Sequence, residues 1–121
     1  MLEFSPLAKT WILDVDGTIV KHNGHLKDGD VLLEGVKEFY SKISDDDKVI
    51  LLTARKDEYL QDLKIFLNEN NIRYDYILTD MPFGERILVN DRKPSGLNTA
   101  YAVNKDRDDK LNIEFTINED L

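Results

Sequence analysis

The sequence contains no cysteine. Disulfide bridges and thiolate metal sites are therefore excluded. No apolar run approaches the roughly 20 residues that a membrane-spanning helix needs. The first residues, MLEFSPLAKT, lack the basic start and long apolar stretch of a signal peptide. We therefore expect a cytoplasmic protein with no membrane partner.

Positive charge is also scarce, since 16 lysine and arginine residues face 24 aspartate and glutamate residues and the net charge is -8. A general nucleic-acid binder needs a basic face that neutralises phosphates, so we exclude nucleic acid as a partner. One small phosphorylated substrate, held by a metal ion and a few local cations, stays compatible with this charge. The 121 residues, of which 41% are hydrophobic and 33% charged, predict one globular domain over residues 1–121.

What the sequence does contain is a series of short apolar runs. They are continuous rather than alternating, which predicts strands that are buried on both faces of a parallel sheet. The runs occupy residues 11–13, 49–52, 76–78 and 87–89.

Helical patterns separate the first three runs. Apolar residues recur at helical spacing over 36–43 and again over 60–67, and Asp57 is in position to cap the second helix. Strands that alternate with helices predict an α/β fold with a Rossmann-like parallel sheet flanked by helices.

The chain changes character after the third run. Only about eight residues separate Leu78 from Ile87, too few for a crossover helix, so we expect an extended return with turns at Pro82 and Gly84. Near the C-terminus, apolar and polar residues alternate over 112–117. This alternation predicts a C-terminal edge strand with one buried face.

Polar residues follow the predicted strands. Ligands of open parallel sheets bind at the carboxyl ends of the strands, so these residues are expected along one edge. Asp14 and Asp16 would face the same side, about 6 to 7 Å apart. With Asp91 they form an all-oxygen set of three carboxylates, which suits Mg²⁺.

Small and hydroxyl residues accompany these carboxylates. Gly17 permits a sharp turn that brings backbone N–H groups close to an anion. Thr18 and Thr53 can each donate a hydroxyl hydrogen bond to a phosphate oxygen. The set is typical of phosphoryl transfer, in which a metal ion and hydrogen-bond donors neutralise the transferring group.

The apolar run that leads into Asp14-Val15-Asp16-Gly17-Thr18 resembles the first motif of the haloacid dehalogenase (HAD) superfamily. Leu51-Leu52-Thr53 resembles its second motif, and Val89-Asn90-Asp91 its fourth. The resemblance covers roughly residues 10–95, in the correct order. It implies a HAD-type fold and phosphate-ester chemistry, because the second aspartate of the first motif is typical of phosphatases and phosphomutases.

The resemblance also implies a role for each position. Asp14 would be the nucleophile that forms an aspartyl-phosphate, and Asp16 the acid and base that serves the leaving group and water. Mg²⁺ would be held by the Asp14 carboxylate, the Asp16 backbone carbonyl and Asp91. Thr53 would bind the phosphoryl group.

Two further residues, Asn90 and Arg55, are expected beside these groups.

The sequence departs from the family's pattern at the lysine of the third motif, which neutralises the nucleophile and the phosphate. Residues 79–86 hold no lysine. Arg86 begins the fourth predicted strand, about 16 Å from its far end, and is expected at the opposite edge. We favour Lys93 over Arg55 as the substitute.

About sixteen residues separate Gly17 from the first helix, enough for a flap but not for a cap domain. The segment 90–94 is similar to small members of the superfamily associated with bacterial surface-polysaccharide biosynthesis. The resemblance implies a capless phosphatase that acts on a sugar phosphate. Because a capless site is left uncovered and the predicted edge strand is a natural pairing surface, we also expect a homo-oligomer.

Two alternatives stay open. A receiver-like signalling domain has this length and similar polar residues at strand ends, but it needs its phospho-accepting aspartate after a middle strand, where this chain has Thr53. A catalytically weak HAD-like binding protein would explain the missing lysine. No P-loop or dinucleotide-binding glycine motif is present.

Overall fold

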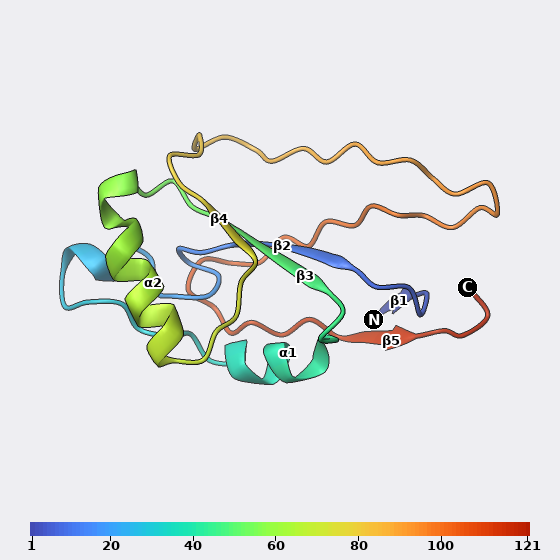
Figure 1. The fold of residues 1–121 in the computed structure, drawn as a ribbon, viewed down its shortest axis with the longest axis horizontal. Helices are drawn as coiled ribbons and strands as arrows, with labels where there is room; N and C mark the ends of the chain where they lie inside the picture. The colour runs from blue at the N-terminus through green and yellow to red at the C-terminus, as the bar shows by residue number, and fades with distance from the viewer.

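The computed structural model describes residues 1–121 and has an α/β architecture built on a parallel sheet. The main sheet consists of β2 (Thr10–Asp14), β3 (Lys48–Leu52) and β4 (Tyr76–Leu78), in the order β2-β3-β4 (Figure 1). The predictions for the first three strands are thus confirmed. None of the helices has the length and apolar character that crossing a membrane requires.

Two helices connect these strands, α1 (Val36–Lys42) before β3 and α2 (Leu60–Glu69) before β4. Both crossovers step in the same direction across the sheet, and right-handed crossovers then place both helices on one face. One continuous core joins that face to both helices. Its members include Leu13, Val49, Leu51, Val36, Phe39, Leu63 and Leu67.

The opposite face of the main sheet has no helix over it. The strand register places Ile12, Ile50 and Tyr76 in one row of this face, followed by Leu52 and Leu78 in the next. Ile12 is 46% exposed and Tyr76 62% exposed. The prediction of strands buried on both faces is therefore wrong, because only half of a doubly wound arrangement is present.

Two short 3₁₀ helices flank the site region. The first, η1 (Gly24–Leu26), lies in the flap between β2 and α1, and the second, η2 (Asp57–Tyr59), leads into α2. The prediction that Asp57 caps the second helix is wrong, since no side chain caps η2 or α2. The Asp57 carboxylate instead accepts a hydrogen bond from the hydroxyl of Thr79 at 3.1 Å.

A separate two-stranded parallel sheet joins the ends of the chain. It pairs β1 (Leu2–Phe4) with β5 (Phe115–Ile117), so a C-terminal strand is confirmed within the predicted range (Figure 1). The predicted buried face is wrong, since Phe115 is only partly buried and Ile117 is exposed. The rings of Phe4, Trp11 and Phe115 contact one another with centroid distances of 5.4 to 5.9 Å. This aromatic cluster links the small sheet to β2.

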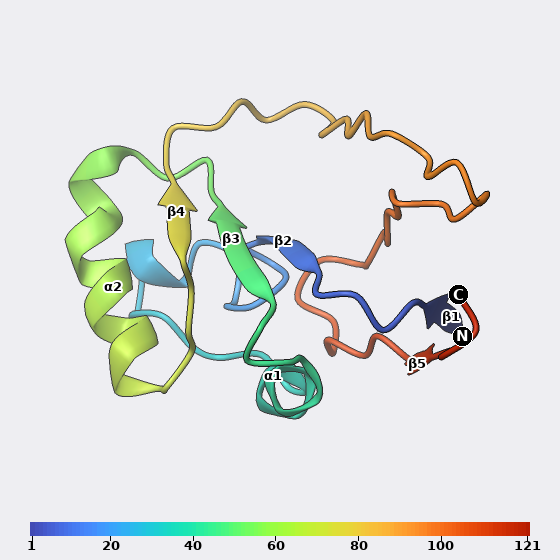
Figure 2. The ribbon, with the colours of Figure 1, turned by 45° about the vertical axis from the view of Figure 1, so that its right-hand side comes forward.

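The fourth predicted strand is absent. Residues 87–89 form no strand, and Ile87 is 86% and Val89 90% exposed. They belong to a long extended excursion, residues 82–105, which we call the arm (Figures 1 and 2). The prediction fails because the eight residues after β4 are too few to return the chain for another parallel strand.

The arm has two legs and a turn. The outward leg leaves the carboxyl end of the main sheet and runs in the direction opposite to β2 (Figure 1). The turn is closed by hydrogen bonds from Lys93 N to Leu97 O at 3.0 Å and from Gly96 N to Lys93 O at 2.8 Å. The returning leg ends where Lys105 Nζ donates to Gly17 O at 3.0 Å. Both ends of the arm thus lie at the carboxyl end of the sheet.

Candidate functional site

The loop after β2 presents the two carboxylates of the first motif. Val15 and Ile19 are fully buried and anchor the loop in the core. Gly17 adopts a φ of 85° and its N–H donates to Val20 O at 2.7 Å, which closes the turn. With the alternate side chains buried, Asp14 and Asp16 are left at the carboxyl edge of the sheet.

Asp16 is held by two residues that follow β3. The hydroxyl of Thr53, a fully buried residue, donates to Asp16 Oδ2 at 2.8 Å. The guanidinium of Arg55 donates to Asp16 Oδ1 through Nε at 3.0 Å and Nη2 at 2.8 Å. Both oxygens of Asp16 therefore accept hydrogen bonds in this arrangement. Thr53 and Arg55, both predicted for the site, do lie beside Asp16.

Arg55 also binds a second carboxylate, that of Asp30, which was not among the predicted site residues. Its Nη1 and Nη2 donate to the two oxygens of Asp30 in the flap at 3.1 and 2.6 Å. Burial acts to lower the pKa of Arg55, but the hydrogen bonds and charges of Asp30 and Asp16 outweigh it and raise the pKa. This fork fixes the flap over the loop. In the sequence, Asp30 looks like any acidic residue of a glycine-containing loop.

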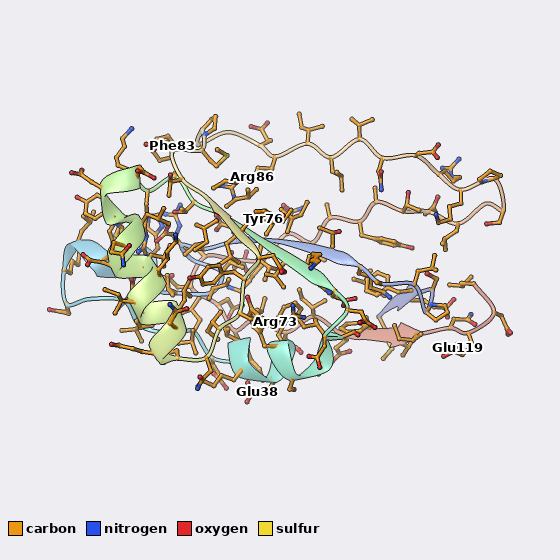
Figure 3. All side chains as sticks on the ribbon, viewed as in Figure 1. Glu38, Arg73, Tyr76, Phe83, Arg86 and Glu119 are labelled. Atoms are coloured by element: carbon orange, nitrogen blue, oxygen red, sulfur yellow. The ribbon has the colours of Figure 1, made fainter.

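Asp14 is the more accessible of the two carboxylates, with its side chain 36% exposed. Thr18 Oγ1 lies 3.1 Å from Asp14 Oδ2 and donates to it. Arg86 Nη1 donates to Asp14 Oδ1 at 2.7 Å from the start of the arm. Figure 3 shows Arg86 between the arm and the sheet, whereas Phe83 lies at the outer side of the bend.

This contact corrects two expectations about the cation. Arg86 was expected at the opposite edge, but the outward leg runs against β2 instead of along it, so its first residue stays at the carboxyl edge. Lys93 was favoured for the site, yet it lies in the turn of the arm. Within one chain, Arg55 and Arg86 are the cations that contact Asp16 and Asp14.

His25 lies beside Asp16. Its Nδ1 is 4.0 Å from Asp16 Oδ1, and its ring meets the Tyr59 ring at a centroid distance of 5.0 Å. Burial lowers the pKa of His25 and so does Arg55, against the opposing effect of Asp16 and Asp30. Nδ1 has no hydrogen-bond partner. Nothing in the sequence distinguishes His25 from its neighbour His22.

The predicted magnesium site is not assembled within the chain. Asp91 is exposed, and its backbone carbonyl accepts a hydrogen bond from the Thr99 hydroxyl on the returning leg. Asn90 likewise bonds to Thr99 O at 2.8 Å and contacts neither site carboxylate. No group of three or more histidine, cysteine, aspartate or glutamate side chains is placed to hold a metal ion. The residues of one chain therefore do not fit the magnesium ion that the resemblance implies.

The chain was also compared with protein-family models, curated proteins and solved structures, and it matches none of them.

Proposed function

We propose that the protein is a phosphoric monoester hydrolase of the HAD type, in which Asp14 is the nucleophile. The observation that carries this proposal is the arrangement around Asp14. A half-exposed carboxylate lies at the carboxyl edge of a parallel sheet, and a hydroxyl and a guanidinium group contact its two oxygens. Carboxylates that substrate can reach, beside donors that neutralise phosphate, are suited to phosphoryl transfer.

In the proposed reaction, an Asp14 oxygen attacks the phosphorus atom of the ester. The bond between phosphorus and the leaving oxygen breaks, and the leaving oxygen takes a proton. Water then attacks the aspartyl-phosphate, which releases inorganic phosphate and restores the carboxylate. Arg86 and Thr18, which contact Asp14 in the free protein, would transfer their hydrogen bonds to the phosphoryl oxygens.

Asp16, which is 2 positions after Asp14 in the same loop, is the proposed proton donor to the leaving oxygen. Both of its oxygens accept hydrogen bonds from Thr53 and Arg55. Oδ1 accepts two hydrogen bonds from Arg55, whereas Oδ2 accepts one from Thr53 and keeps a second lone pair that can carry the proton. We propose a small sugar phosphate as the substrate, on the resemblance of segment 90–94.

The test is release of phosphate from a panel of sugar phosphates by the purified protein. Asp14→Asn should abolish turnover, because an amide is a poor nucleophile. Asp62→Asn, the same change at an exposed position of α2, should leave turnover intact. Assays with Mg²⁺ and with a chelator test the cofactor prediction. Wild-type turnover by Asp14→Asn would contradict the assignment of Asp14.

A second candidate is a phosphate-binding protein with little or no turnover. The observation that favours it is that Arg86 and Arg55 already pair with the two carboxylates, while a third carboxylate is missing. Such a protein would bind a sugar phosphate in calorimetry without releasing phosphate. A receiver-like domain would instead take up phosphate once from an acyl phosphate and hydrolyse no ester.

A further inference from the structure

The main sheet lacks a strand on one side. β2 pairs only with β3, so the backbone groups on its other edge have no strand partner. No backbone hydrogen bond outside the β2–β3 ladder involves residues 10–14. The uncovered apolar face of the sheet begins at this edge with Ile12, which is 46% exposed. Unpaired edges and apolar faces of this kind are rarely left open in a stable protein.

The arm, in contrast, belongs to no sheet. Its outward leg, residues 84–92, is extended and carries the β-branched and apolar run Ile87-Leu88-Val89, all of it exposed. The returning leg adds Tyr101 and Val103, which are 46% and 55% exposed. No core residue of the chain lies in residues 82–105. The chain therefore contains both an unoccupied strand position and an extended segment with the composition of a strand.

Within the chain, the outward leg does not pair with β2, and it cannot lie parallel to β2. A parallel strand beside β2 must begin at the amino edge of the sheet, and a crossover of this kind needs a dozen or more residues. Only about eight residues follow β4 before Ile87, and in the structure they keep Arg86 at the carboxyl edge. A second copy of the chain has no such restriction.

We propose that two copies of this protein exchange arms, so that the outward leg of each becomes the missing strand on the free edge of β2 in the other. The direction of the leg supports this arrangement. It runs opposite to its own β2, so a two-fold axis perpendicular to the strands makes it parallel to the β2 of the second copy (Figure 1).

In the same arrangement, Asp91 of one copy lies beside Asp14 and Asp16 of the other. From Arg86 to Asp91 the extended chain advances about 16 Å, which is the length of a five-residue strand such as β2. Asp91 thus lies at the far end of its own sheet, and in the exchanged pair this end meets the carboxyl edge of the other copy. There it joins Asp14 and Asp16 of the second copy as the third carboxylate. This last step rests on the proposed function, whereas the exchange itself does not.

The space between the arm and β2 fits such a partner. The arm and the body enclose an open groove of about 1710 Å³, lined by β2, both legs of the arm and residues 109–113. That volume exceeds the roughly 300 to 1,000 Å³ of a pocket for a small ligand. Each arm contributes about two dozen residues, and specific interfaces involve about 20 to 30 residues a side.

Light scattering at micromolar concentration and site-directed cross-linking test the exchange. We expect twice the 14.0 kDa mass of the chain. Because the chain has no cysteine, each single-cysteine variant carries one thiol. A mixture of Ile12→Cys and Val89→Cys chains should form a disulfide between chains under mild oxidation, because facing strand positions meet the distance requirement. Ile12→Cys mixed with Ser41→Cys on α1 should not.

Two results would overturn the exchange. The first is a 14.0 kDa species throughout the concentration range. The second is a dimer in which Ile12→Cys joins Val89→Cys no better than the α1 control. Neither result depends on enzymatic activity, so the exchange is decided even where the proposed function fails.

Mixing inactive subunits tests the role of Asp91. Asp14→Asn chains keep an intact arm, and Asp91→Asn chains keep an intact loop. After the two are unfolded together and refolded, mixed dimers hold one complete site, so about a quarter of the wild-type activity should return. Activity no higher than that of the separate variants would show that Asp91 does not act across the pair.

Discussion

At the scale of single residues, Asp47 shows how one buried carboxylate joins three parts of the chain. It accepts hydrogen bonds from the backbone N–H groups of Lys9 at 2.8 Å and Ser44 at 3.2 Å, and from the indole of Trp11 at 2.9 Å. Burial acts to raise the pKa of Asp47, but these three donors outweigh it and lower the pKa below 3.8. The start of β2 is thereby tied to the turn before β3.

This arrangement predicts how stability depends on pH. Because the pKa of Asp47 is lowered by folding, its contribution is present above pH 3.8 and is lost as the pH falls through the folded value. Asp47→Asn should lower the free energy of unfolding at pH 7 by about 1 to 3 kcal/mol. The difference in the free energy of unfolding between Asp47→Asn and wild type should shrink as the pH falls below 3.8.

Denaturant unfolding followed by the fluorescence of Trp11 measures this effect, since Trp11 is the one tryptophan of the chain and contacts Asp47. Asp45→Asn is a matched control in the same turn, because Asp45 is exposed. A deficit that stays constant between pH 7 and pH 3 would contradict the assignment.

At the scale of elements, the start of α1 is joined to the C-terminal segment by close contact. Gly35 precedes α1 with a φ of 88°, and a Cβ at this position would overlap the carbonyl oxygen of Leu111. The N–H of Leu111 donates to Glu34 O at 2.9 Å, and the Leu111 side chain is buried in the core. Only glycine allows both the conformation and the approach.

Gly35→Ala should therefore destabilise the protein more than Gly29→Ala does. Gly29 also has a positive φ of 99°, but a Cβ there would have no neighbour within 4 Å. The conformational cost alone is about 1 to 2 kcal/mol, and both variants bear it. The additional loss in Gly35→Ala measures the contact with Leu111. Equal losses in denaturant unfolding would show that the contact adds nothing.

The flap is held in place by side-chain contacts and not by a cap domain. Asp30 in the flap and Asp16 in the loop share the guanidinium of Arg55, which is 2% exposed at its side chain. Buried charges of this kind depend on one another, because removal of one partner leaves the others unpaired. The closure of the site is thus linked to the position of Asp16.

At the scale of the whole molecule, large apolar side chains are exposed on the open face of the sheet and along the arm, where Phe83 is 93% exposed and Val89 90% exposed. Association that covers this surface stabilises the folded chain by mass action.

The thermal midpoint of unfolding should therefore rise with protein concentration. Val89→Asp should remove this dependence, because it would place an unpaired charge in the exchanged strand. Val31→Asp makes the same change at an exposed flap position and should keep the dependence. Calorimetric scans over a hundredfold range of concentration measure the midpoints. A wild-type midpoint that does not change with concentration would argue against exchange.

The sequence alone determined the local features of the molecule. Continuous apolar runs and helical spacing located β2, β3, β4, α1 and α2, because each pattern reflects burial within a few neighbouring residues. The same local reasoning brought Asp14, Asp16 and Thr53 to one edge, since parallel strands share their carboxyl ends. Spacing along the chain was sufficient in each case.

Only the tertiary structure decided what depends on chain direction and distant partners. The run Ile87-Leu88-Val89 has the composition of a strand, yet its environment is an extended arm. Because the outward leg of the arm runs opposite to β2, Arg86 contacts Asp14, whereas Lys93 and Asp91 lie away from the carboxyl edge of the sheet. Asp30 reached Arg55 through the closure of the flap. No local pattern encodes these outcomes, because they depend on how far a connection can return the chain, and the connection after β4 is too short for another parallel strand.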